Sequence, residues 1–180
     1  MTFARLKRSL LLTICGLLIG GEVLAEATEA ELKAAFVFNF TKYVEWPAES
    51  LASTPGSLNV CLLGPRDNFF DAILDFDGKK VSDRNLNVRN IGPSESPKHC
   101  QVLVLAEREV AKIESVLKRV EGYPVLTVSS SDRFLDAGGI IGLVTDADKV
   151  RFDVNLVAAK RANLVLSSNL LRLARQVRKP

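Results

Sequence analysis

The sequence offers few residues that could form an active site. The 180-residue chain contains a single histidine, His99, and three cysteines. His99 directly precedes Cys100, and because neighbours on a strand point to opposite faces of a sheet, this histidine is poorly placed to act as a base for that cysteine. The signatures of serine hydrolases, phosphate-binding loops, zinc proteases and dithiol oxidoreductases are absent. We therefore expect a protein that is not an enzyme and that binds no metal or cofactor.

Two cysteines have the context of a disulfide. Cys15 lies within the first 25 residues, which leaves Cys61 and Cys100 in the remainder of the chain. Each begins an apolar run, and adjacent parallel strands that start side by side would bring the two cysteines together. The bridge would close a loop of about 40 residues, which the chain-entropy model values at roughly 4 kcal/mol. The alternative is a pair of buried free thiols.

The N-terminal segment has the three-part pattern of a secretory signal. A basic start precedes an apolar run over residues 9–20, and small residues occupy the two positions that a signal peptidase reads, the second being Ala25. The apolar run is about 12 residues long, whereas a membrane-spanning helix needs roughly 20. We expect cleavage after Ala25, so that residues 1–25 are a signal peptide and residues 26–180 form the exported domain. An uncleaved membrane anchor is the alternative.

Alternating apolar strands and helices predict the fold class. Hydrophobic residues make up 47% of the chain and charged residues 25%, which is typical of a globular domain. Apolar runs over residues 58–64, 101–105 and 124–128 predict buried strands, as in a parallel sheet covered on both faces. Residues 140–145 and 150–154 predict a β-hairpin, which adds antiparallel pairing. We therefore predict a single α/β domain with a mixed, mostly parallel sheet and helices on both faces.

The helices are predicted from their caps and their apolar periodicity. The first begins with a capping box formed by Thr28 and Glu31 and runs to about residue 44. Its expected apolar face, with one polar interruption, consists of Leu32, Ala35, Phe36, Asn39, Phe40 and Tyr43. Residues 50–57 are expected to form a loop. Later helices are expected over about 67–76, 107–120, around Phe134, over 155–162 and over 168–179.

An unusual polar group lies near the end of the first predicted helix. Asn39, Lys42 and Trp46 have i, i+3 and i+7 spacing, which places them on one side of a helix. An amide, a lysine and the single tryptophan of the chain could line a pocket or an interface, with Arg151 in the same pocket. The alternative is that Lys42 is solvated and that Trp46 plugs the edge of the sheet.

Positive charge is concentrated near the C-terminus. The formal net charge of the chain is only +3, which gives no argument for nucleic acid binding. Residues 151–180 nevertheless carry seven basic residues and one acidic residue. Arg172 and Arg175, on the last predicted helix, could form a docking patch for an acidic partner or a lipid surface. The alternative is a solvated helix face whose cations complement the helix C-terminus.

Five segments of the chain together carry a family resemblance. The most specific is the segment over residues 34–47, which ends in Glu-Trp-Pro. The others follow over residues 61–64, 124–128 with Phe134 and 138–142, 150–155, and 167–174. In this order the segments resemble the motifs of the YfiR family of periplasmic proteins, also described as YfiR/HmsC-like.

The resemblance implies a periplasmic α/β protein that regulates and does not catalyse. Relatives bind the periplasmic sensor domain of an inner-membrane diguanylate cyclase of the YfiN type, and so lower cyclic di-GMP signalling and biofilm formation. An outer-membrane lipoprotein can sequester the repressor, homodimers are common, and redox control through disulfides is implied. We expect the contact surface to comprise exposed apolar residues and the basic C-terminal helix. The alternative is a periplasmic small-ligand-binding module without a cyclase partner, with its pocket at Asn39, Lys42, Trp46 and Arg151.

Overall fold

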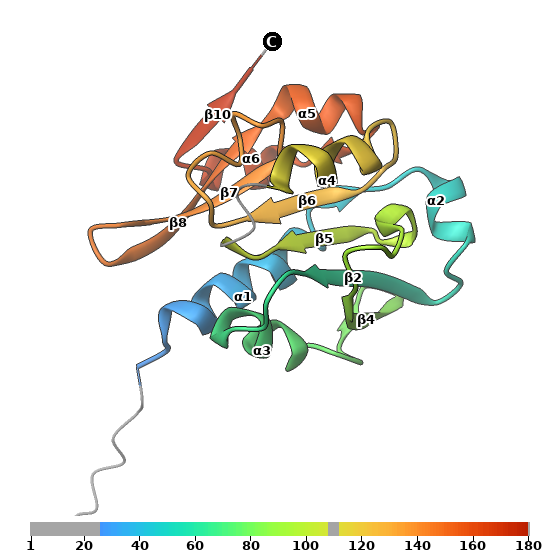
Figure 1. Cartoon of the computed structure of the whole chain (residues 1–180), viewed down its shortest axis with the longest axis horizontal. Helices are drawn as coiled ribbons and strands as arrows, with labels where there is room; N and C mark the ends of the chain where they lie inside the picture. The colour runs from blue at the N-terminus through green and yellow to red at the C-terminus, as the bar shows by residue number, and fades with distance from the viewer. Residues whose placement is uncertain (1–25, 108–111, 180) are drawn as a thin grey trace, which may run out of the picture.

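An eight-stranded sheet organises the computed structural model, which describes residues 26–107 and 112–179 (Figure 1). Its order is β10-β8-β7-β6-β5-β2-β4-β3. The strands are β2 (Ser57–Leu63), β3 (Lys80–Val81), β4 (Arg84–Ile91), β5 (Val102–Leu105), β6 (Leu126–Ser129), β7 (Ile141–Asp146), β8 (Lys149–Asn155) and β10 (Gln176–Arg178). Two pairs, β7 with β8 and β3 with β4, are antiparallel, and the other neighbours are parallel. The predicted mixed, mostly parallel sheet is therefore confirmed.

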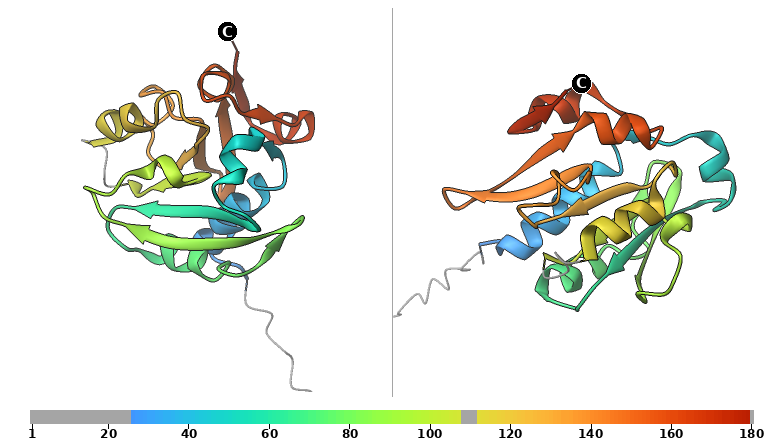
Figure 2. Two further views of the ribbon diagram at one scale, coloured as in Figure 1. Left: turned by 90° about the vertical axis from the view of Figure 1, so that its right-hand side faces the viewer. Right: turned by 45° about the horizontal axis from the view of Figure 1, so that its top comes forward.

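Helices cover both faces of this sheet, as predicted (Figures 1 and 2). Alternate strand residues point to opposite faces, and the core accordingly divides into two clusters. One cluster packs α1 and α3 against Val60, Leu62 and Val104, and the other packs α4 against Leu103 and Leu105. The helices are α1 (Glu29–Phe40), α2 (Ala48–Ala52), α3 (Asn68–Leu74), the 3-10 helix η1 (Pro97–His99), α4 (Ile113–Val120), α5 (Leu156–Arg161) and α6 (Ser168–Leu173).

The first helix begins as predicted but ends earlier and buries a face that only partly matches the prediction. The Thr28 hydroxyl accepts the Glu31 N–H at 3.2 Å, and a Glu31 carboxylate oxygen accepts the Thr28 N–H at 2.7 Å. The helix ends at Phe40, not near residue 44, and the chain continues into the short strand β1 (Val44–Glu45), which pairs with β9 (Val165–Leu166).

The predicted apolar face of α1 is only partly correct, because Phe40 is buried as expected and Phe36 and Tyr43 pack against the core. Ala34, Val37 and Phe40 are the buried residues, whereas Leu32 is 41% exposed. Most of the residues between 34 and 40 are apolar, so periodicity alone singles out no face. Tertiary packing decides instead: Phe40, a member of the predicted face, meets the Phe152 ring with centroids 5.0 Å apart, and Ala34 and Val37 join it in the core.

Two further local predictions are corrected by the structure. The expected loop over residues 50–57 begins inside α2, which starts directly after Pro47. The expected short helix around Phe134 is a series of turns, although the Phe134 ring is fully buried. The helix expected over residues 107–120 is described from Ile113 onward as α4, and its predicted apolar residue Val110 lies outside the described residues.

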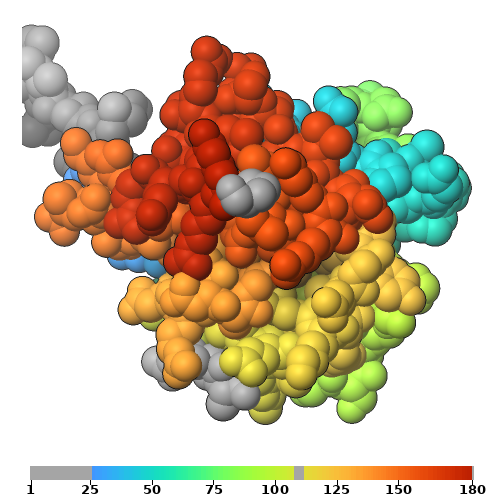
Figure 3. Space-filling model, turned by 90° about the horizontal axis from the view of Figure 1, so that it is seen from above, coloured from blue at the N-terminus to red at the C-terminus, as the bar shows by residue number. Residues whose placement is uncertain are grey.

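The last helix is much shorter than predicted. It is capped by Ser167 as expected, but it ends at Leu173, and residues 176–178 form the edge strand β10 beside β8. The Arg175 N–H donates to the Phe152 carbonyl at 2.8 Å, which starts this pairing. Arg175 therefore does not lie on a helix. Figure 3 shows the C-terminal segment gathered over the face seen from above.

The hairpin and the helix after it agree with the sequence. β7 and β8 pair from Ile141 with Val154 to Asp146 with Lys149, and the turn residues Ala147 and Asp148 have positive φ, as a tight hairpin turn requires. Asn155 caps α5, and Asn163 adopts the left-handed conformation expected after its end.

Candidate functional site

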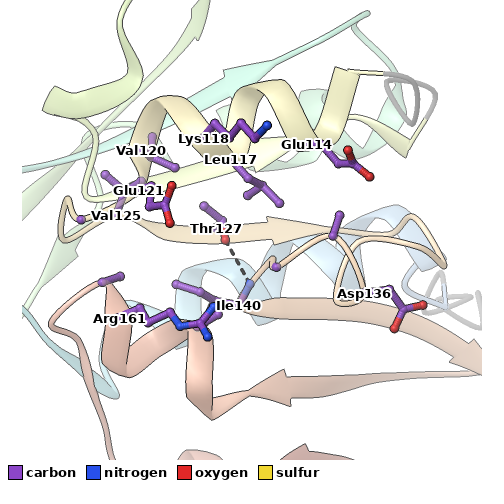
Figure 4. Close-up of a pocket in the computed structure, with 15 residues that line it drawn as sticks. Glu114, Leu117, Lys118, Val120, Glu121, Val125, Thr127, Asp136, Ile140 and Arg161 are labelled. Atoms are coloured by element: carbon purple, nitrogen blue, oxygen red, sulfur yellow. Dashed lines mark hydrogen bonds between the residues drawn. The ribbon is translucent and has the colours of Figure 1, made fainter.

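The connection between β6 and β7 leaves part of one sheet face without a covering helix. Residues 130–140 run through turns only, so no helix of the described residues lies between α4 and α5. A groove of about 340 Å³ lies there (Figure 4). Its apolar lining consists of Leu117, Val120, Val125, Ala137, Ile140, Ala158 and Ala162. The groove is the candidate functional site, and its volume is within the range of small-molecule pockets.

The floor of the groove forms where two strands diverge. β6 and β7 share only two register pairs, Val128 with Ile141 and Ser129 with Gly142. Just before these pairs, the Thr127 hydroxyl accepts the Ile140 N–H at 3.0 Å, as the dashed line in Figure 4 marks. A side chain therefore replaces the backbone pairing and satisfies a buried N–H.

Charges without an ion-pair partner among the described residues lie on both walls of this groove, and α4 contributes Glu114 and Lys118 to them. Glu121 follows α4, and Arg161 ends α5; Figure 4 shows both side chains reaching toward the space between the helices. Neither forms an ion pair with a described residue. Asp136, which also lines the groove, is already ion-paired, because its Oδ1 accepts a hydrogen bond from Arg178 Nη1 at 2.6 Å. The groove can therefore receive a group with an apolar body and charged ends.

Sequence reasoning missed Arg161 and Glu121 as candidate site residues. Their positions depend on the absence of a helix between β6 and β7, and periodicity does not reveal that. The one available signal was the glycine pair at 138 and 139, which closes the connection after a span too short for a full helix and its turns.

The residues predicted for a pocket near the first helix are placed in different surroundings. The Lys42 ammonium donates to the Asn39 side-chain oxygen at 2.9 Å and lies 4.3 Å from the Phe38 ring centroid, and both polar residues are exposed. Arg151 is exposed on β8 opposite Val144. Among the described residues, no hydrogen bond or ion pair joins Arg151 to this group.

Trp46 connects the β1–α2 segment to the sheet by a hydrogen bond. Its indole N–H donates to the Gln101 carbonyl at 3.2 Å, and that carbonyl also accepts the Leu126 N–H at 2.8 Å. The buried Gln101 side chain accepts the Asn59 N–H at 2.8 Å and donates to the Ser50 carbonyl at 3.2 Å. The Trp46 indole therefore has a structural role.

The two predicted C-terminal arginines differ in their surroundings. Arg175 makes two bonds to Asp153, with Nε to Oδ1 at 2.9 Å and Nη2 to Oδ2 at 2.6 Å. The Asp153 side chain is only 8% exposed, and its hydrogen bonds and charge raise the pKa of Arg175. Arg172 is exposed on α6 and donates to Asn169. Arg172 is therefore the more available of the two for a partner.

The predicted disulfide is present in the structure. Cys61 on β2 and Cys100 before β5 are bridged, with Cα atoms 5.8 Å apart, and both are buried. The strands β2 and β5 are parallel neighbours, as predicted, but they do not start side by side, because β5 begins opposite Val60, inside β2. His99 is exposed, and its carbonyl accepts the Asn59 side-chain amide at 3.0 Å.

The described residues also lack the features of a metal site and of a membrane-spanning helix. Within residues 26–107 and 112–179, no group of three or more His, Cys, Asp or Glu side chains is arranged to hold a metal ion. In the same part of the chain, no helix has the length and apolar character needed to cross a membrane.

Comparison with known proteins identifies the family. The sequence profile described as YfiR/HmsC-like matches residues 30–175, which is nearly all of the described domain. The chain belongs to the YfiR/HmsC-like family. Members of the YfiR/HmsC-like family are in general regulatory and not catalytic proteins.

A solved structure shares the fold of this YfiR/HmsC-like chain. It is the crystal structure of a conserved domain protein from Vibrio cholerae O1 biovar El Tor strain N16961, with a TM-score of 0.53 and 9% sequence identity. The match covers 86% of this chain and 62% of the other, so this chain spans less than two thirds of that protein. At this identity the likeness concerns the fold alone.

Proposed function

We propose that this protein is exported to the periplasm, where it binds the periplasmic sensor domain of an inner-membrane diguanylate cyclase of the YfiN type and lowers cyclic di-GMP signalling. The observation that carries the proposal is the family match over residues 30–175. The buried Cys61–Cys100 disulfide supports export, because such bonds persist in oxidising compartments. Residues 1–25 act in this proposal as a signal peptide cleaved after Ala25.

Binding alone is sufficient for repression. If the protein binds the inactive conformation of the cyclase more tightly than the active one, the equilibrium moves toward the inactive state by that difference in affinity. An outer-membrane lipoprotein that sequesters the protein would then release the cyclase. A homodimer presents two copies of the same surface, which strengthens binding to a dimeric partner.

The groove between α4 and α5 is our proposed contact site for the cyclase. Its unpaired Glu121 and Arg161 offer one charge of each sign beside apolar side chains. Charge reversals Glu121→Lys and Arg161→Glu should each weaken binding of the mature protein to the purified sensor domain in calorimetric titration. Arg172→Glu tests the predicted contribution of α6 in the same assay. Arg175 is unsuitable, because its reversal would leave the buried Asp153 carboxylate unpaired.

Lys80→Glu is the matched control for these reversals. Lys80 is exposed on β3, at the opposite edge of the sheet from α6, and has no ion-pair partner among the described residues. The control should bind as the native protein does. Native affinity in both groove variants would remove the groove from the interface.

The groove also supports a second candidate function, a periplasmic small-ligand-binding module. A volume of about 340 Å³ with apolar side chains and unpaired charges of both signs in its lining can hold a small amphipathic molecule. Trp46 does not line this groove, so its fluorescence is a poor reporter. Thermal unfolding with a metabolite panel is the direct assay. A stabilising ligand should lose its effect in Leu117→Trp, which fills the groove, and a flat response across the panel would contradict this function.

A further inference from the structure

We infer that the C-terminal segment over residues 154–179 is a docking surface for an anionic phospholipid membrane. This segment, called here the C-terminal crest, comprises α5, β9, α6 and β10. The inference goes beyond the proposed function, because it concerns a lipid surface and holds whether or not a cyclase is the partner.

The first observation is the charge of the crest. Residues 154–179 contain six basic residues and no acidic residue. Two of the six are neutralised from outside the crest, since Arg175 pairs with Asp153 and Arg178 pairs with Asp136. The remaining four form no ion pair with any described residue: Lys160, Arg161, Arg172 and Lys179. The crest therefore keeps a net positive charge of its own, whereas the rest of the exported chain is net negative.

The second observation is the exposure of two large apolar side chains. Leu173, at the end of α6, is 68% exposed, and Val165, on β9, is 58% exposed. The other large hydrophobic residues exposed in the described chain, Leu32 and Tyr123, are 41% and 39% exposed. The two large apolar side chains with the highest exposed fractions among the described residues therefore belong to the crest.

The third observation is that the crest is held as one platform. β9 pairs with β1, β10 pairs with β8, and α5 packs against both β9 and β10. The Arg175–Asp153 and Arg178–Asp136 pairs tie its end to the sheet and to the β6–β7 connection. Figure 3 shows the segment gathered on one face of the molecule. The ion-paired Arg175 and Arg178 therefore stabilise the crest, and its unpaired cations are available to bind a partner.

The composition of the crest favours lipid over an acidic protein as the occupant. Protein interfaces are built around a buried core enriched in aromatic residues, and residues 154–179 contain no aromatic residue. Lipid headgroups require only cations near a dispersed negative surface, and single apolar side chains can insert between them. The crest carries the exposed Val165 and Leu173 together with unpaired Lys and Arg residues, which fits that requirement.

Vesicle sedimentation of the mature protein, residues 26–180, tests the proposal. The protein should pellet with vesicles of phosphatidylethanolamine and phosphatidylglycerol and not with vesicles of phosphatidylcholine alone, and salt should weaken the binding. Lys160→Gln and Arg172→Gln should each lower the partition coefficient about fivefold, the usual effect of one basic residue near such a surface. Leu173→Ser should lower it severalfold. Lys80→Gln and Leu32→Ser make the same changes outside the crest and should leave binding unchanged.

Three results would overturn the proposal. Equal binding to both vesicle types would exclude recognition of anionic lipid. Equal losses in the crest variants and the matched controls would exclude the crest as the site. No vesicle binding at all, together with weaker binding of Arg172→Glu to the soluble sensor domain, would assign the crest to the protein partner. Because the vesicle assay contains no cyclase, its failure leaves the repressor proposal standing.

Discussion

Gly139 illustrates how closely the chain packs at single residues. A Cβ built at this position would lie 2.3–2.5 Å from carbons of the buried Phe134 ring, so a larger side chain forces the ring or the backbone to move. We expect Gly139→Ala to lower the free energy of unfolding by about 1–3 kcal/mol, the usual cost of overpacking a core. Urea unfolding measures the loss. Gly92→Ala is the control, because Gly92 has open space and needs no positive φ; equal losses would contradict the steric explanation.

The Arg175–Asp153 pair lies where the chain leaves α6 and enters β10. Arg175→Ala leaves the nearly buried Asp153 carboxylate without its charged partner, so the pairing of β10 with β8 should weaken. Hydrogen exchange should show faster exchange of the backbone amides of β10 in this variant. Arg172→Ala, which loses only a bond to exposed Asn169, should leave these amides as protected as in the native protein. Unchanged protection in Arg175→Ala would show that the strand does not depend on the ion pair.

At the scale of elements, the N-terminus of α1 should respond to acid. The Thr28 N–H and hydroxyl bind the Glu31 carboxylate and lower its pKa below the ordinary value of 4.5. A lowered pKa contributes stability that is present above 4.5 and is lost as the pH falls through the folded-state pKa. Glu31→Gln should therefore lose less stability than the native protein between neutral and acid pH in urea unfolding. Glu49→Gln is the control, and a native-like acid loss in Glu31→Gln would contradict the capping contribution.

The disulfide joins the interior of β2 to the residue that lies two positions before β5. It spans 39 residues of sequence between β2 and the start of β5. Replacing both Cys61 and Cys100 with Ala should lower the free energy of unfolding by about 4 kcal/mol in the chain-entropy model. Chemical denaturation of this variant and of the native protein measures the difference. Thiol labelling of the exported, denatured native protein should find no free cysteine outside the leader, and two free thiols would refute the bridge in the cell.

The sequence predicted those structural features whose causes lie in neighbouring residues. The Thr28–Glu31 capping box, the buried strands and the hairpin follow from neighbouring residues, and all were predictable. The buried face of α1 was predictable only in part, because apolar residues surround the helix: the burial of Phe40 was expected, and that of Ala34 and Val37 was not. The end of α6 and the candidate groove were missed. Arg175 was expected on the helix but pairs with Asp153, which is 22 residues away in sequence. The groove depends on the divergence of β6 from β7.

At the scale of the whole molecule, chain order and charge define distinct surfaces. β2 starts the parallel part of the sheet, β4 is added on one side of it, and β5, β6 and β7 follow on the other. The groove lies over the later strands, between α4 and α5, and Arg161 belongs both to its wall and to the positively charged C-terminal crest. A partner in the groove and a membrane under the crest would therefore be adjacent. This arrangement suits a regulator that acts on a membrane-bound partner.

The most direct test of the repressor account is the cellular concentration of cyclic di-GMP with and without this gene. Deletion should raise cyclic di-GMP, and expression of the full chain should restore the native level. A chain that lacks residues 1–25 should stay in the cytoplasm and fail to restore it, because the sensor domain is periplasmic in this account. No change on deletion under several growth conditions, or full restoration by the chain without residues 1–25, would contradict the account.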